Sequence, residues 1–106
     1  MDSHNFIVAK HLYDELWLFV DSKYFDTFHI ELDRLDESND SAGVVMRWPG
    51  HTANRWIFVT SEGITFRRSS YSLADPDVLS AVLNEAKSWI SEMIEWEVTH
   101  STLPKL

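Results

Sequence analysis

The sequence predicts one α+β domain, residues 1–106, built as an antiparallel β-sheet meander of four to six strands with one long C-terminal helix packed on one face. Two patterns predict it. The last third of the chain repeats apolar residues at intervals of three and four, which is the period of a helix with one buried side. The middle of the chain alternates apolar and polar residues, which is the period of a half-buried strand. The length leaves room for one hydrophobic core.

The first 24 residues give two competing patterns. Residues 15–20 (Glu-Leu-Trp-Leu-Phe-Val) favour a strand that pairs with the next one through the turn residues 21–23. An amphipathic helix suits this part of the chain equally, because Phe6, Ala9, Leu12 and Leu16 recur at helical spacing. We expect a strand at 15–20 and assign no structure to residues 5–13.

The first clear strand begins at Phe28. Here Phe28, Ile30 and Leu32 alternate with polar residues, so we expect them to face the core. Residues 36–43 are polar and predict a loop. A short strand follows at 44–48.

The next two predicted strands form a hairpin. Residues 55–60 and 64–68 are rich in β-branched and aromatic side chains and flank Ser61-Glu62-Gly63. Gly63 can adopt a positive φ in this short connection.

The C-terminal helix is predicted over residues 76–97. Asp75 is a good N-cap, Pro76 suits the first helical position, and Asp77 complements the positive end of the helix dipole. The expected buried stripe consists of Leu79, Val82, Leu83, Ala86, Trp89, Ile90, Met93 and Ile94.

Composition excludes several classes of site. The chain has no Cys, so disulfides, thiolate metal sites and cysteine nucleophiles are absent. We expect a cytoplasmic protein, because no secretory signal and no apolar run of about 20 residues is present. The net charge of −8 disfavours nucleic acid as a direct ligand and favours a basic protein partner.

The charge is distributed unevenly. Residues 1–42 contain ten acids and three bases, and residues 69–106 contain six acids and two bases. Residues 43–68 contain one acid and four arginines: Arg47, Arg55, Arg67 and Arg68. On neighbouring strands these arginines could form a basic stripe for a carboxylate-rich or phosphate-bearing ligand. We favour the alternative of cross-strand ion pairs with acids such as Glu31 and Asp33.

One strand face carries a candidate catalytic or metal-binding set. His29, Glu31 and Asp33 alternate along the strand, so they point to one side and could bind a divalent metal or share a proton. Alternation alone produces the same arrangement on any solvated strand face, which is the interpretation we prefer. The chain also lacks a Gly-x-Ser-x-Gly elbow, and its three glycines form no phosphate-binding loop. We therefore predict no enzyme activity, no cofactor and no metal.

The tryptophans differ in their expected exposure. Trp17, Trp56 and Trp89 lie within apolar elements and are predicted to be core residues. Trp48 and Trp96 are better candidates for partial exposure, and exposed Trp is frequent at interaction hot spots.

These features predict a small acidic protein-binding module without enzyme activity. The expected type is an immunity or phage anti-defence inhibitor that occupies a basic surface of a nuclease or other nucleic-acid-binding protein. A small acidic secretion or assembly chaperone acting as a dimer is the alternative, and an enzyme or metal-binding protein using His29, Glu31 and Asp33 ranks last. We expect no direct contact with nucleic acid or membrane. The expected partner-binding residues are Asp36, Glu37, Asp40, Asp14, Asp21, Asp26, Trp48 and Trp96.

Overall fold

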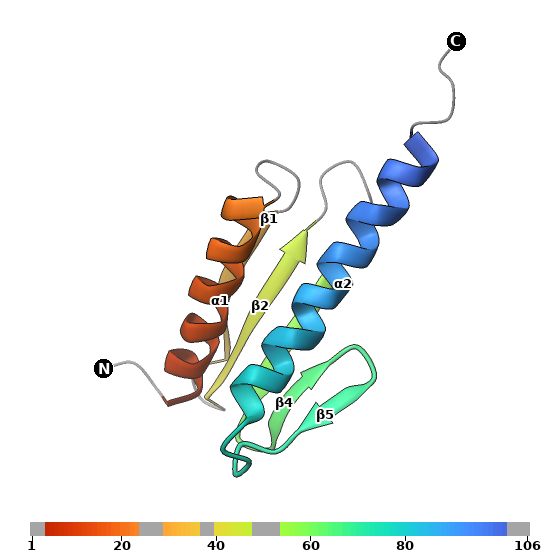
Figure 1. Ribbon diagram of the computed structural model, residues 1–106. Coiled ribbons are helices and arrows are strands. Elements are labelled where there is room, and N and C mark those ends of the chain that lie inside the picture. Colours follow the sequence, from red (N-terminus) through yellow and green to blue (C-terminus); the bar gives the residue numbers. More distant parts are fainter. Residues whose placement is uncertain (1–3, 24–28, 37–39, 48–53, 102–106) are drawn as a thin grey trace.

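The computed structural model describes residues 4–23, 29–36, 40–47 and 54–101 (Figure 1). Within these ranges the chain forms an N-terminal helix, a five-stranded antiparallel sheet in the order β1-β2-β3-β4-β5, and a long C-terminal helix. The fold class predicted from the sequence is confirmed. The elements are α1 (His4–Lys23), β1 (His29–Asp36), β2 (Ser41–Arg47), β3 (Arg55–Thr60), β4 (Gly63–Phe66), β5 (Ser69–Tyr71) and α2 (Val78–Ser101).

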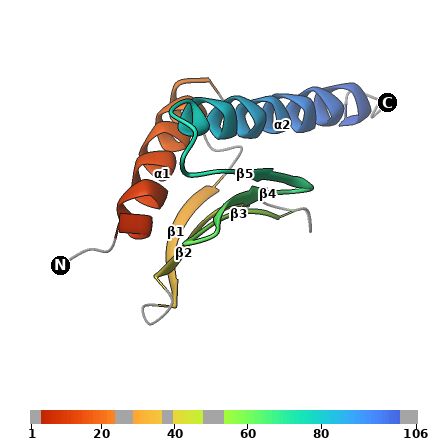
Figure 2. The same cartoon turned by 90° about the horizontal axis from the view of Figure 1, so that it is seen from below.

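Both helices lie on the same face of the sheet (Figure 2). Alternate side chains of the strands point towards the helices, as the pattern predicts. Residues of both helices and of β1 to β4 join one hydrophobic cluster, against which Tyr71 of β5 also packs. Within the described residues, neither helix contains a run long and apolar enough to cross a membrane. The core residues contributed by the strands are Ile30, Ala42, Val44, Met46, Ile57, Val59, Ile64 and Phe66.

The predicted strand at 15–20 is wrong, because these residues belong to α1. The buried residues of this helix follow the helical period, whereas Trp17 and Leu18 are exposed. The apolar residues on its solvent-facing side interrupt that period and give residues 15–20 the continuous apolar pattern that is typical of a strand. The buried stripe consists of Ala9, Leu12, Leu16 and Val20.

Helix α2 begins at Val78 and ends at Ser101, whereas the sequence predicted a helix over residues 76–97. The predicted N-cap at Asp75 is two residues early, because the first bond of the helical pattern runs from the Ala81 N–H to the Asp77 carbonyl at 3.0 Å. Asp75 instead holds the turn before the helix: the Asp77 backbone N–H donates to Asp75 Oδ1 at 2.9 Å, and the Val78 N–H donates to the Asp75 carbonyl at 3.2 Å. Pro76 and Asp77 therefore form a turn that leads into the helix.

The predicted loop at 36–43 is too long. Strand β1 extends to Asp36 and β2 begins at Ser41, with an irregular register between Asp33 and Asp36. Phe28, which was predicted to face the core, is not among the described residues.

The predicted strand at 64–68 is also wrong at its end. The chain turns at Arg67 and Arg68, and Ser69–Tyr71 then returns as β5, a strand that was not expected. The Arg-Arg pair hid this turn, since tight hairpins usually show Gly, Asn or Asp there. The preceding hairpin agrees with its prediction, because Gly63 has a φ of 135°.

Candidate functional site

The sheet face turned away from both helices is the main candidate site (Figure 2). Because side chains alternate along a strand, the residues between the core positions point to this side. We call it the open face. Its described residues include His29, Glu31 and Asp33 of β1, Gly43, Val45 and Arg47 of β2, Trp56, Phe58 and Thr60 of β3, Gly63 and Thr65 of β4, and Ser70 of β5.

A stacked aromatic pair occupies the middle of the open face. The rings of Trp56 and Phe58 are 5.5 Å apart between centroids and inclined by 4°. Val45 lies opposite Trp56 in the β2–β3 register and is only 1% exposed, although no helix covers it. Phe58 is 40% exposed, and its β2 neighbour Gly43 offers no side chain to cover it. The open face therefore has an apolar cluster of its own with an accessible ring.

Charged side chains border this cluster on the β1 side. Arg47 Nε donates to Glu31 Oε2, so the cross-strand ion pair expected from the sequence is confirmed for Arg47. Asp33 is exposed and makes no ion pair with the described residues. Its carboxylate is therefore available to a cation on a partner.

His29, Glu31 and Asp33 share one face, as expected, but they do not converge. A strand rises about 3.3 Å per residue, which separates the Cα atoms of His29 and Asp33 by about 13 Å. Among the residues that the structure describes, no three His, Asp or Glu side chains are grouped for a metal ion. Glu31 pairs with Arg47 instead.

The four arginines do not form one stripe. Arg47 lies on the open face beside Glu31, whereas Arg55, Arg67 and Arg68 line a separate pocket next to Glu85 of α2. The basic middle of the sequence is thus divided between the two sides of the sheet.

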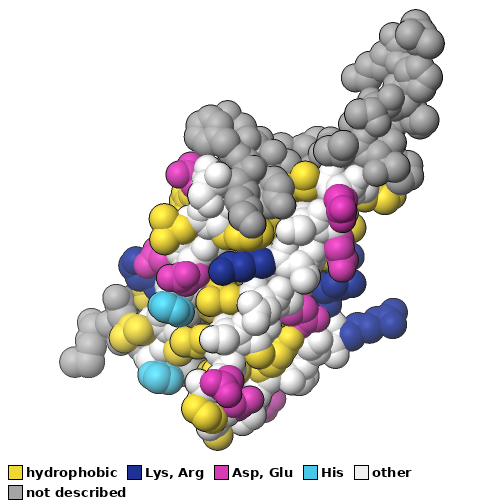
Figure 3. All heavy atoms as spheres, in the orientation of Figure 1, with side chains coloured by type: hydrophobic (Ala, Val, Ile, Leu, Met, Phe, Trp, Pro, Cys, Tyr) yellow, Lys and Arg dark blue, Asp and Glu magenta, His cyan; other side chains and the backbone are white. Residues whose placement is uncertain are grey.

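The predicted contact acids are also dispersed. Asp14 is exposed and pairs with Lys10 at 3.0 Å, and Asp21 is exposed near the C-terminal end of α1. Asp40 lies at the other end of α1, where its carbonyl accepts a hydrogen bond from Asn5 Nδ2 at 2.8 Å. Asn5 and Asp21 are 16 positions apart in sequence, which corresponds to about 24 Å along the helix. On the helix side of the molecule, acidic side chains are scattered among apolar and neutral ones (Figure 3).

The remaining predicted contact residues fall into three groups. Trp96 is 48% exposed, as expected. The backbone of Asp36 pairs with Ser41 at the end of β1. Asp26, Glu37 and Trp48 lie outside the described residues.

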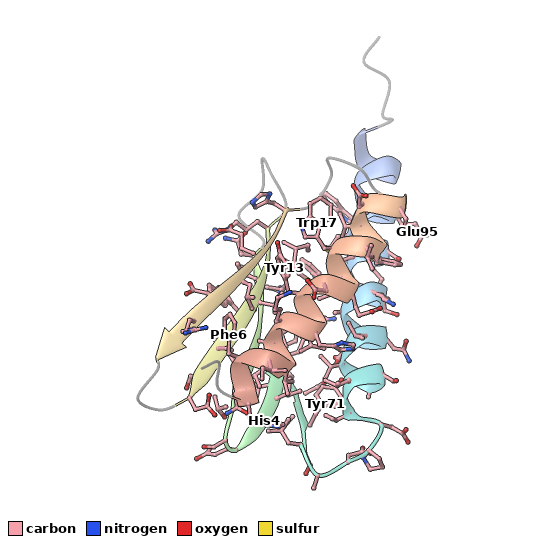
Figure 4. The ribbon with its side chains drawn as sticks, turned by 90° about the vertical axis from the view of Figure 1, so that its left-hand side faces the viewer. His4, Phe6, Tyr13, Trp17, Tyr71 and Glu95 are labelled. Atoms are coloured by element: carbon pink, nitrogen blue, oxygen red, sulfur yellow. The ribbon has the colours of Figure 1, made fainter. Side chains whose placement is uncertain are left out.

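Two tryptophans predicted for the core are not fully buried. Trp17 is 44% exposed near the C-terminal end of α1 (Figure 4), and Trp56 is half-buried on the open face. Figure 4 also shows Phe6 extending from α1 towards β1, where the Arg34 guanidinium lies 4.0 Å from its ring centroid. Strict alternation in β3 places Trp56 and Phe58 together on one face, but it does not identify that face as the open one, because Ile57 and Val59 on the other face are equally apolar.

Comparisons with protein-family models, with curated proteins and with solved structures find no match. Inferences about function therefore depend on the residues of this chain.

Proposed function

We propose that this chain is a small cytoplasmic protein-binding module without enzyme activity, and that the open face is its contact surface. The proposed partner is a nuclease or other nucleic-acid-binding protein whose basic surface the chain occupies as an inhibitor of the immunity or phage anti-defence type. The observation that carries the proposal is the accessible Trp56–Phe58 stack on a sheet face without a covering helix.

Aromatic rings on a rigid sheet are well suited to anchor a partner. Trp and Tyr dominate interface hot spots, and rings held by packing lose little entropy on binding. The exposed part of Phe58 amounts to roughly 80 Å², and covering it would contribute about 2 kcal/mol. A partner that presents an apolar side chain over Phe58 and Thr65 would gain this contribution.

Charge favours a basic partner over a neutral one. The Glu31–Arg47 pair neutralises itself, which leaves Asp33 as the uncompensated charge among the described open-face residues. The whole chain carries −8, so its field attracts a cationic surface and accelerates association at low salt. The complementary surface is therefore an apolar side chain bordered by Lys or Arg.

A comparative affinity capture tests the proposal. The full chain and three variants, Phe58→Ser, Asp33→Ser and Leu18→Ser, are immobilised and exposed to host lysate at low salt. Leu18 is 65% exposed on α1, so Leu18→Ser is a matched control for loss of an exposed apolar side chain on the helix side. We expect one basic protein to bind the wild type and the control, to be lost with Phe58→Ser, and to elute at lower salt from Asp33→Ser. Equal retention by Phe58→Ser would contradict the proposal, provided circular dichroism shows that the variant is folded.

The same aromatic pair is compatible with the second function, a small acidic secretion or assembly chaperone acting as a dimer. In that case a second copy would cover Phe58. Sedimentation equilibrium separates the two: a monomer supports the inhibitor, whereas a dimer that Phe58→Ser dissociates supports the chaperone.

A further inference from the structure

Three arginines line one pocket on the helix side of the sheet, away from the open face. Arg55 begins β3, and Arg67 and Arg68 form the turn between β4 and β5. The pocket has a volume of about 520 Å³, and Ser69 and Glu85 complete its described lining. The β3–β4 register ends with the pair Ile57–Phe66, so Arg55, two residues before Ile57, lies close to the turn that follows Phe66. In Figure 3, basic side chains project at the edge of the molecule where Figure 1 places the β4–β5 turn.

Ion pairs among the described residues do not neutralise the positive charge of this pocket. Glu85 is the acid in its lining, and hydroxyl groups engage both carboxylate oxygens. Ser69 Oγ donates to Oε1 at 2.9 Å, and Tyr71 Oη donates to Oε2. Within the described part of the chain, none of the three arginines forms an ion pair.

The groups around Glu85 are held in place. The Tyr71 side chain lies between the sheet and α2 (Figure 4). Burial, together with the hydrogen bond to Glu85, raises the pKa of Tyr71, so its hydroxyl keeps its proton and continues to donate. Arg55 lies over Trp89, with its guanidinium carbon 5.9 Å from the ring centroid, and its Nη1 donates to the Asn54 carbonyl at 3.3 Å. One guanidinium of the pocket is thereby oriented before any ligand arrives.

The turn that carries the other two arginines does not have the residues that would stabilise its backbone conformation best. Phe66 pairs with Ser69, so Arg67 and Arg68 are the two central residues of a tight hairpin. Arg67 has a φ of 57°, a left-handed conformation in which glycine is strongly preferred at this kind of position. Backbone strain of this type concentrates at ligand sites. An arginine at this position is consistent with use of its guanidinium by a ligand.

We propose that the pocket formed by Arg55, Arg67 and Arg68 binds a phosphate monoester group. A phosphate monoester carries close to two negative charges and three acceptor oxygens, which match several guanidinium donors better than a single carboxylate does. A nucleic acid fits less well, because its affinity grows with the number of cations along the backbone and this chain is strongly acidic. The inference is independent of the proposed protein contact, since the two sites lie on opposite sides of the sheet.

Titration of the full chain, followed through the arginine Nε–Hε signals in an NMR spectrum, tests the proposal. Inorganic phosphate, glycerol phosphate and a phosphoserine peptide are added at constant ionic strength near neutral pH. We expect saturable shifts of Arg55, Arg67 and Arg68 and no shift of Arg47, which is paired with Glu31 on the open face. Tighter binding of the peptide or of glycerol phosphate identifies the source of the phosphate group.

Two variants separate binding from folding. Arg67→Gly removes one guanidinium and supplies the residue that the turn prefers, so we expect a chain at least as stable as the wild type that binds phosphate about tenfold more weakly. Arg47→Ser should bind phosphate as the wild type does. Unchanged affinity of Arg67→Gly, shifts reproduced by equal amounts of chloride, or tighter binding of a single-stranded oligonucleotide would each overturn the assignment.

Discussion

Gly63→Ala tests whether β5 is held as closely to β4 as the structure shows. Gly63 is buried, begins β4 and has a φ of 135°. A Cβ added there would lie 2.5 Å from the backbone carbonyl oxygen of Tyr71, which is closer than real Cβ contacts allow. The contact is with backbone, so a side-chain rotation cannot relieve it and β5 has to move.

The cost has three parts. A non-glycine residue at such a φ costs about 1–3 kcal/mol, and overpacking adds about 1–3 kcal/mol. Restriction of the unfolded chain by alanine offsets about 0.4–1 kcal/mol of this. Together these ranges allow a loss of about 1–5.6 kcal/mol in the free energy of unfolding of Gly63→Ala, with a central expectation of about 3 kcal/mol.

Urea unfolding followed by tryptophan fluorescence measures this loss. Thr65→Ala is the matched control, because Thr65 lies in the same strand, is exposed and has no positive φ. The control should lose at most about 1 kcal/mol, the span of strand propensities. If Gly63→Ala loses no more than the control, the close approach of the two strands is refuted.

Three further variants probe the helices and the Tyr71–Glu85 contact. Leu16→Ala should lower the free energy of unfolding by about 2–5 kcal/mol in urea unfolding, because Leu16 is fully buried beneath α1. Lys10→Ala should change it by less than about 0.5 kcal/mol, since the Lys10–Asp14 pair is exposed, and a larger loss would contradict that assignment. The raised pKa of Tyr71 means that the folded chain holds the Tyr71 proton more strongly than the unfolded chain does. The contribution of this group to the free energy of unfolding is therefore complete below pH 10.0 and is lost as the pH rises through the folded pKa. Tyr71→Phe should reduce this alkaline loss in unfolding curves measured across that range, and an unchanged pH profile would exclude a raised pKa of Tyr71 in the folded chain.

An element could be predicted from the sequence where its apolar residues followed a single period, either helical or alternating. Helix α2 has polar residues opposite its buried stripe, so its helical period was visible, and the turn residues before it located its start within two residues, at 76 where the helix begins at Val78. Helix α1 exposes Ile7, Trp17 and Leu18, and these outer apolar residues hid its buried stripe. The helix was therefore missed at residues 15–20 because its solvent-facing side carries large apolar residues.

The candidate sites were harder to predict, because each depends on residues that look ordinary in sequence. The run Trp56-Ile57-Phe58-Val59 is apolar on both faces, and only the position of the helices decides which pair is covered. The turn at Arg67 carries no glycine, so the sequence predicted neither β5 nor the pocket beside it. The cross-strand pair of Arg47 with Glu31 was predictable, because the register of two neighbouring strands follows from alternation.

The sheet separates two kinds of recognition. The open face offers apolar area beside the exposed carboxylate of Asp33, whereas the pocket on the helix side offers guanidinium groups that form no ion pair with the described residues. A single ligand on one side cannot reach the other through five hydrogen-bonded strands. Phe58→Ser should therefore leave phosphate affinity unchanged, and Arg67→Gly should leave retention of the protein partner unchanged. Coupled losses would instead mean that one partner surrounds the sheet edge or that the two sites communicate through β3, which carries Arg55 of the pocket and the Trp56–Phe58 pair of the open face.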